Sequence, residues 1–232
     1  DKVTSTEIDL FLYIGLRQDP WGNINGIYYK DVCLELGIEK QTFYNALYGL
    51  ENKNYIRIRD IKADYWNVCI LNNVFRTKTD DKKGYININK QFLYGWEFKR
   101  LKANEKKIIL RLLYSYRPEQ SLYIYPSKIA EWINLKSKSM AIVYSYCNNI
   151  EKFFPNTRVD GQAGDLIKFI KGNYEPFYDS PKTEREHYLT HKIKHICRIY
   201  KIAYTIPDLK DLIILLAQYA NKGYGKLCSV IC

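Results

Sequence analysis

The chain has 232 residues, and 36 Lys and Arg against 25 Asp and Glu give it a formal net charge of +11 at pH 7. This length allows one large domain or two small ones, and the hydrophobic share of 47% is enough for packed cores. The positive charge indicates a polyanionic partner, most commonly nucleic acid. No apolar run reaches the roughly 18 residues of a spanning helix, so the sequence predicts no membrane partner.

The cysteine spacing and the start of the chain indicate a reduced, cytoplasmic protein. The six cysteines lie apart and form no CxxC pair, so the usual spacing of zinc ligands is absent. The chain begins with Asp1 and shows no charged-then-apolar leader, which predicts a processed chain without a secretory signal. A glycine-rich phosphate loop is absent too, which argues against an ATPase. We therefore expect no metal, no cofactor and no enzymatic activity.

The first third of the chain predicts a helix, a strand, two more helices and a hairpin, in that order. Thr4 to Thr6 offer an N-cap, and the apolar residues after them recur at helical spacing until Asp19-Pro20. Gly37 separates the next two helices, because glycine readily adopts the left-handed backbone of a sharp turn. The elements expected after the first helix are a strand over 25–28, helices over 30–36 and 40–52, and strands over 55–59 and 65–71.

A polar, charged segment at 77–84 is the expected linker, and the same order of elements then starts again. An alternating edge strand is predicted at 85–89, and a strongly periodic helix begins at Asn104. The basic residues from Lys99 to Arg111 are interpreted as a solvated face. The elements expected next are a strand over 122–125, a helix from Pro126, a helix over 137–152, a hairpin over 157–170, and C-terminal helices over 183–203 and 208–221.

An internal repeat supports this division into two units. With one fixed offset of 97 residues and no gaps, apolar positions of the first unit fall on apolar positions of the second. Gly37 falls on Asn134, and these are the two residue types that best tolerate a left-handed backbone. The other paired positions are Phe11 with Ile108, Leu12 with Ile109, Ile27 with Ile124, Phe43 with Met140, and Ile56 with Phe153.

Helix, strand, helix, turn, helix and hairpin is the order of a winged helix-turn-helix domain. The sequence therefore predicts an α+β, mainly helical fold with two tandem winged helix-turn-helix domains and a small C-terminal helical segment. The expected boundaries are 1–76 for the first domain, 77–84 for the linker, 85–172 for the second domain and 181–232 for the C-terminal segment. We expect this segment to dock on the winged helices or, in a homodimer, on a second chain.

In a helix-turn-helix, the third helix lies in the major groove and its outward residues touch base edges. The apolar line expected to face inward is Phe43, Leu47 and Leu50 in the first domain, and Met140, Tyr144 and Cys147 in the second. The outward residues expected to contact DNA from the first domain are Lys40, Gln41, Thr42, Tyr44, Asn45 and Tyr48. Those of the second domain are Ser137, Lys138, Ser139, Ser145 and Asn149.

The two hairpins add basic residues that can follow a phosphate strand. These candidates are Arg57, Arg59 and Lys62 in the first hairpin, and Arg158 and Lys168 in the second. The alternative interpretation is that the helices only present polar faces to water, and that the hairpins carry the charges of any solvated hairpin. Winged helices can also serve as protein-docking modules without binding DNA.

Three histidines, His187, His191 and His195, are spaced four residues apart and form one stripe on a C-terminal helix. Such a stripe can present a row of metal ligands, but the sequence offers no convincing fourth ligand. The stripe is therefore interpreted as part of the wetter side of that helix. Its buried side is expected at Leu189, Ile193, Ile196 and Tyr200.

The second domain also carries a pattern found in a known class of proteins. Tyr85-Ile86-Asn87-Ile88, followed by Glu105–Tyr116 and Ile124–Leu135, then Ser139 and Ile150, resembles the winged-helix modules of low-GC bacterial plasmid and phage replication initiators. The tandem arrangement is similar to plasmid initiators built from two winged helices. This resemblance implies a replication initiator that binds repeated origin sites.

The residues themselves favour a sequence-specific double-stranded DNA-binding protein acting as a transcription regulator. The replication initiator is the first alternative, and a winged-helix docking adaptor that binds no DNA is the second. An operator near a promoter would favour the regulator, and tandem direct repeats would favour the initiator.

Overall fold

The computed structural model describes residues 2–19, 21–62, 65–72, 92, 95–115, 121–135, 140–161, 164–170 and 181–219, without the side chains of 62, 181–188 and 216–219. Within these residues the chain is an α+β protein with two three-stranded antiparallel sheets. The expected linker at 77–84, the edge strand at 85–89 and the helix start at 137–139 lie outside them. None of the described helices is both long and apolar enough to cross a bilayer.

The first group of elements, called unit 1 below, has the order that the sequence predicts. Thr4 caps the first helix in a capping box with Glu7, and Gly37 ends the second in the left-handed conformation at φ 67°. The sheet order is β1-β3-β2, so the last of the three strands along the chain lies in the middle. The elements are α1 (Ser5–Gly15), β1 (Asn23–Tyr28), α2 (Tyr29–Leu36), α3 (Lys40–Asn52), β2 (Ile56–Lys62) and β3 (Tyr65–Ile70).

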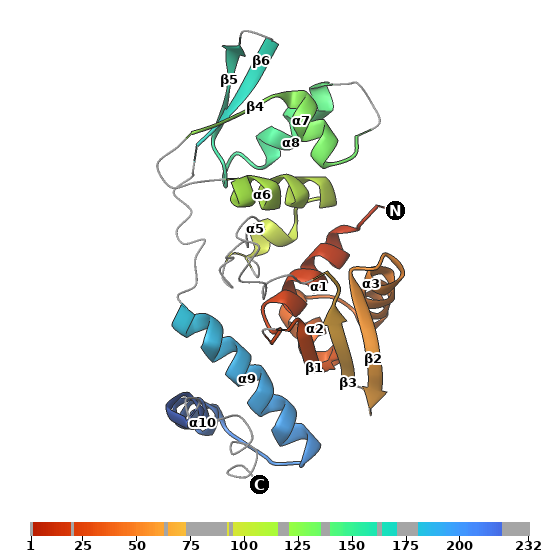
Figure 1. The fold of residues 1–232 in the computed structure, drawn as a ribbon, viewed down its shortest axis with the longest axis vertical. Helices are drawn as coiled ribbons and strands as arrows, with labels where there is room; N and C mark the ends of the chain where they lie inside the picture. Colours follow the sequence, from red (N-terminus) through yellow and green to blue (C-terminus); the bar gives the residue numbers. More distant parts are fainter. Residues whose placement is uncertain are drawn as a thin grey trace.

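The second group, called unit 2 below, repeats this arrangement (Figure 1). Its sheet order, β4-β6-β5, is the same as in unit 1, and both sheets are antiparallel. A short helix, α5 (Trp96–Lys99), precedes it. The elements are α6 (Ala103–Ser115), β4 (Leu122–Ile124), α7 (Pro126–Trp132), α8 (Met140–Asn149), β5 (Asn156–Gly161) and β6 (Gly164–Phe169).

The fixed offset of 97 residues holds only for the middle of each unit. Pro126 begins α7 97 residues after Tyr29 begins α2, and α8 ends 97 residues after α3. Asn134 adopts a left-handed backbone at φ 51°, as the repeat predicts from its match with Gly37. The two hairpins, in contrast, begin 100 residues apart, at Ile56 and at Asn156.

The longer connection between α8 and β5 explains this shift. Phe153 and Phe154 are both buried in the core of unit 2 before β5 begins. The predicted match of Ile56 with Phe153 is therefore wrong, because Ile56 is the first residue of a strand and Phe153 lies in the connection. A gapless comparison could not detect an insertion whose own residues are apolar.

Equivalent positions in the first helices of the two units are 98 residues apart, one more than the predicted offset of 97. Glu7 and Glu105 occupy the same place in α1 and α6, since each accepts a backbone N–H three residues earlier, at 2.6 Å from Thr4 and 2.7 Å from Lys102. These glutamates are 98 residues apart, so the expected pairing of Phe11 with Ile108 and of Leu12 with Ile109 is wrong.

Each of these glutamates also ties the first helix of its unit to the end of the third. Glu7 Oε1 lies 2.5 Å from Lys53 Nζ after α3, and Glu105 Oε1 accepts Asn149 Nδ2 of α8 at 2.7 Å. Both glutamate side chains are buried. Burial alone would raise the pKa of Glu7, but hydrogen bonds from Lys53 and Thr4 lower it below its ordinary value. The orientation of the third helix is thus fixed to the first helix in both units.

Helix α1 belongs to two cores. Leu10, Tyr13 and Ile14 are buried in the core of unit 1, as an amphipathic helix on that sheet requires. Leu12 and Leu16 lie on another side of α1 and pack against the core of unit 2. Helices α1 and α6 are in contact (Figure 1), and the two units are therefore joined by apolar packing as well as by the chain.

The C-terminal segment forms two packed helices, α9 (Pro181–Ile199) and α10 (Ile206–Tyr219). Among the described side chains of α9, those of Leu189, Ile193 and Cys197 are buried, and they pack with Tyr204, Leu209, Leu212 and Ile213. Tyr200, predicted on the buried side, is 60% exposed, and Ile196 is only half-buried. The predicted helix end at 203 is also wrong, because α9 ends at Ile199 and Lys201 has a positive φ of 53°.

Helix α9 docks on unit 1 through the histidines that the sequence places on its wetter side. His191 Nε2 lies 2.9 Å from the carbonyl oxygen of Asn25 in β1, and the ring of His195 lies edge-on to Tyr65 at 5.7 Å. A Cβ added at Gly26 would be 1.8 Å from His195 Nδ1, so β1 approaches the helix closely there. The prediction that the histidines form a wet stripe is therefore wrong for His191 and His195.

Candidate nucleic-acid interface

Helix α3 has one buried face and one exposed polar face, as the sequence predicts. Phe43, Ala46, Leu47 and Leu50 are buried in the core of unit 1. On the opposite side Gln41, Asn45 and Tyr48 are exposed, together with Lys40 at the start of the helix. Gln41 Nε2 donates to Asn45 Oδ1 at 3.0 Å, so two adjacent amides are held together on this face. Both amides still have polar atoms for partners outside the protein.

Two of the predicted outward residues of α3 lie elsewhere. The Tyr44 ring is only half-exposed and packs against Trp66, with 5.4 Å between ring centroids, and against the neighbouring Phe43. Thr42 is half-buried on the other flank of the helix. The prediction that Tyr44 points outward is therefore wrong, because its ring packs on Phe43 and Trp66 at the edge of the core of unit 1.

A cluster of lysines and tyrosines lies where α2 and α3 begin. Lys40 Nζ is 4.8 Å from the Tyr29 ring centroid, and Lys30 Nζ is 5.9 Å from that of Tyr28. Tyr28 also stacks on Tyr65 of β3 at 5.2 Å. Of these five residues the sequence predicted only Lys40 as a contact. The adjacent Tyr28-Tyr29-Lys30 at a strand-to-helix junction was the signal available for three of the others, and Tyr65 had none.

The hairpin of unit 1 places two of its three predicted basic residues on the surface. Arg57 and Arg59 of β2 are exposed, and the register shifts between Ile58 and Asp60, next to Arg59. The Lys62 backbone pairs with Tyr65, while its side chain lies outside the described atoms. Ile61 beside it is 54% exposed.

Helix α8 of unit 2 is turned differently from the prediction. Val143 and Cys147 are its fully buried residues, whereas Met140 and Tyr144 are half-buried at the edge of the core. The prediction that Met140 and Tyr144 face inward is thus only partly right. Ser145 is exposed as expected. The other predicted contacts of this helix start, Ser137, Lys138 and Ser139, lie outside the described residues.

Asn149 has a structural contact of its own at the far end of α8. Its amide nitrogen donates to Glu105 at the start of α6, which holds the side chain in one orientation within unit 2. A side chain that holds two helices together is a poor choice for reading bases. We leave Asn149 out of the interface for this reason.

The structure brings Arg158 of the second hairpin onto α8. Its guanidinium carbon lies 3.7 Å from the centroid of the Tyr144 ring, and the side chain remains exposed. Lys168 of β6 is half-buried, with its Nζ 5.8 Å from the Tyr123 ring. Arg158 and α8 therefore form one continuous surface, while Lys168 lies against β4.

The polar atoms on these surfaces can accept and donate hydrogen bonds, and their cations can neutralise phosphates. In the part of the chain that the structure describes, no three His, Cys, Asp or Glu side chains converge as they would around a metal ion. Comparison of the chain with models of protein families, with curated proteins and with solved structures gave no match.

Proposed function

We propose that the chain is a sequence-specific double-stranded DNA-binding protein with two tandem winged helix-turn-helix units, acting as a transcription regulator. The observation that carries this proposal is the repeated order of elements with the same sheet order, β1-β3-β2 and β4-β6-β5. In each unit a left-handed residue, Gly37 or Asn134, follows the second helix. The third helix then follows, with Gln41 and Asn45 exposed on α3 and Ser145 exposed on α8.

The exposed residues on α3 and β2 suit contacts to base edges and contacts to phosphates. The Gln41 and Asn45 amides can pair with adenine edges in the major groove. Lys40, Arg57 and Arg59 are exposed cations that can contact phosphates on either side. In unit 2, Ser145 and Arg158 would have the corresponding roles. The net charge of +11 supports a polyanionic partner for both units.

Two alternative functions differ in whether the protein binds duplex DNA and in which DNA sites it binds. A replication initiator would bind tandem direct repeats at an origin, with the same helices in the same roles. A protein-docking adaptor would bind no duplex even at low salt. The exposed Ile199, Ile206 and Ile214 of the C-terminal helices also offer a face to a second copy, so a homodimer stays a prediction beside the docking of α9 on unit 1.

We expect binding to duplex DNA to weaken steeply as salt rises. Each phosphate neutralised by a lysine or arginine releases counterions, so log affinity should fall against log salt with a slope of about −0.9 per phosphate contact. Fluorescence anisotropy with duplexes recovered from a random library, between 50 and 300 mM salt, would measure this slope. A flat response, or no binding at low salt, would favour the docking adaptor.

Replacing Gln41 and Asn45 with Ala should relax base preference over one part of the recovered site. Each lost base contact should cost about 1–3 kcal/mol of discrimination, while binding to unrelated duplex should change little because the phosphate contacts remain. Lys210→Ala with Asp211→Ala is a matched control, since these exposed residues lie on α10 and the net charge is unchanged. Equal base preference in the variant and the parent would show that α3 does not read this site.

A further inference from the structure

The contact between the two units contains a buried ion pair. Lys106 of α6 is fully buried, and its Nζ lies 2.6 and 2.8 Å from the two carboxylate oxygens of Asp9 in α1. The same Nζ donates to the Lys99 carbonyl oxygen at 3.1 Å and lies 5.1 Å from the Phe98 ring. All three donor directions of the ammonium group are thus directed at oxygens of α1 and α5.

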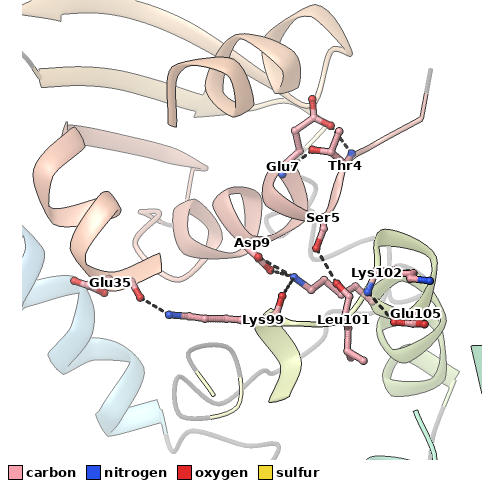
Figure 2. A network of polar contacts seen from close by, with 10 residues as sticks. Thr4, Ser5, Glu7, Asp9, Glu35, Lys99, Leu101, Lys102 and Glu105 are labelled. Atoms are coloured by element: carbon pink, nitrogen blue, oxygen red, sulfur yellow. Dashed lines mark hydrogen bonds and ion pairs between the residues drawn. The ribbon is translucent and has the colours of Figure 1, made fainter. Parts of the chain in front are cut away.

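Further polar contacts surround this pair, and Figure 2 shows Ser5, Asp9, Lys99 and Leu101 converging between α1 and α5–α6. Ser5 Oγ donates to the Leu101 carbonyl at 2.9 Å, and Lys99 Nζ donates to the Glu35 carbonyl of α2 at 2.7 Å. Apolar packing alone is non-directional and tolerates sliding of one helix on another. Hydrogen bonds and a buried ion pair are satisfied in one relative position only.

The pair is also connected to both candidate recognition helices. Glu7, two residues from Asp9, fixes α1 to the end of α3 through Lys53. Glu105, adjacent to Lys106, fixes α6 to the end of α8 through Asn149. A continuous path of polar contacts therefore runs from α3 through α1 and α6 to α8.

We propose that Asp9 and Lys106, assisted by Lys99, are positioning residues that hold α3 and α8 at one fixed separation, so that the protein accepts its two half-sites at one spacing only. This inference rests on the proposed function, because it needs both helices to bind one duplex. One extra base pair moves a half-site by 3.4 Å along B-DNA and turns it by roughly a tenth of a helical turn. A rigid pair of helices cannot follow that change without losing contacts on one side.

The test compares spacing preference in variants of unchanged net charge. The variant Asp9→Leu with Lys106→Met replaces the ion pair by apolar side chains of similar length, which proteins often tolerate without loss of stability. The control is Lys128→Met with Glu131→Leu, which removes an exposed ion pair within α7. Duplexes recovered from a random library by the unmodified protein are used with their spacer shortened or lengthened by one and two base pairs. Each half-site is also used alone.

For the unmodified protein and the control, each one-base-pair change should weaken binding by about tenfold or more, as the loss of a base contact does. The Asp9→Leu/Lys106→Met variant should bind each isolated half-site as the parent does, while its spacing penalty falls to about threefold or less. A role in stability alone would weaken binding at every spacing equally. The ratio between spacings therefore isolates positioning from folding.

An unchanged spacing penalty in a folded double variant overturns the inference and leaves the proposed function standing. A parent that binds duplex without any spacing preference overturns it as well. If the parent binds no duplex, both the inference and the proposed function fail. If the double variant does not fold by circular dichroism, Lys99→Met carries the test with the same two outcomes, because it removes the bond to the Glu35 carbonyl and leaves the Asp9–Lys106 pair in place. Its control of equal net charge is Lys128→Met.

Discussion

Replacing Lys106 with Met is expected to lower the free energy of unfolding by about 3–5 kcal/mol. The substitution removes the ion-pair partner of the Asp9 carboxylate, at a contact where the Lys106 side chain is fully buried. Burial already raises the pKa of Asp9 and lowers that of Lys106, so both charges depend on each other. Urea unfolding followed by circular dichroism at pH 7 would measure the loss.

Two comparisons separate the buried pair from a general effect of losing a lysine. Asp9→Leu with Lys106→Met should recover most of the lost stability, because apolar replacements remove both desolvation costs together. Lys128→Met, which breaks an exposed pair with Glu131, should cost less than about 1 kcal/mol. A loss below 1 kcal/mol for Lys106→Met would mean that water reaches Asp9 and that the pair is not enclosed.

The sequence predicted α3 correctly because every local signal agreed. Phe43, Leu47 and Leu50 recur at helical spacing, and Gly37 supplies the left-handed turn before the helix. The polar face at Gln41 and Asn45 follows directly from that periodicity. Signals of this kind lie within one short stretch of the chain, so they can be read without knowledge of the fold.

Lys106 shows where such reasoning fails. Its neighbours Lys102, Lys107 and Arg111 made it one member of a basic run, which is normally a solvated face. Its partner Asp9 lies 97 residues earlier, and only the packing of α1 against α6 brings the two together. A pattern of residue types cannot show that one lysine in a basic run forms an ion pair with a carboxylate of a distant element.

The histidines of α9 were misplaced for the same reason. The sequence assigned the buried side of the helix to one apolar stripe and left the other sides to water. The structure gives α9 two contact faces, one on α10 through Ile193 and Cys197, and one on β1 through His191 and His195. A helix packed on two sides does not show the single stripe that a periodicity argument expects.

Helix α9 is expected to leave unit 1 as the pH falls from about 6.5 towards 4. The Asn25 carbonyl can only accept, so His191 must carry its proton on Nε2 in the docked state. Burial, with the nearby charge of Arg17, lowers the pKa of docked His191 to about 4 from an ordinary value of 6.5. Burial, with Arg198, lowers the pKa of His195 as well. The histidines of an undocked helix take up protons more readily, so low pH favours the undocked state.

The charged groups around His191 and His195 do not offset this effect. Arg17, two residues after the end of α1, faces them from one side, and Arg198 lies on α9 itself. The two carboxylates of α2 are already in ion pairs, Glu35 with Arg17 and Asp31 with Arg198. Docking is therefore strongest above pH 6.5, and for His191 alone the loss at pH 4 is on the order of 3 kcal/mol.

Proton NMR of the imidazole resonances across pH 4–8 would measure this directly, with the Gly26 amide reporting whether α9 is docked. His191→Gln is the matched control, because its amide can still donate to the Asn25 carbonyl but gains no charge in acid. In that variant detachment should move to lower pH, leaving only the contribution of His195. If His191 titrates near 6.5 while the Gly26 amide keeps its docked position, the histidine is solvated and does not couple docking to pH.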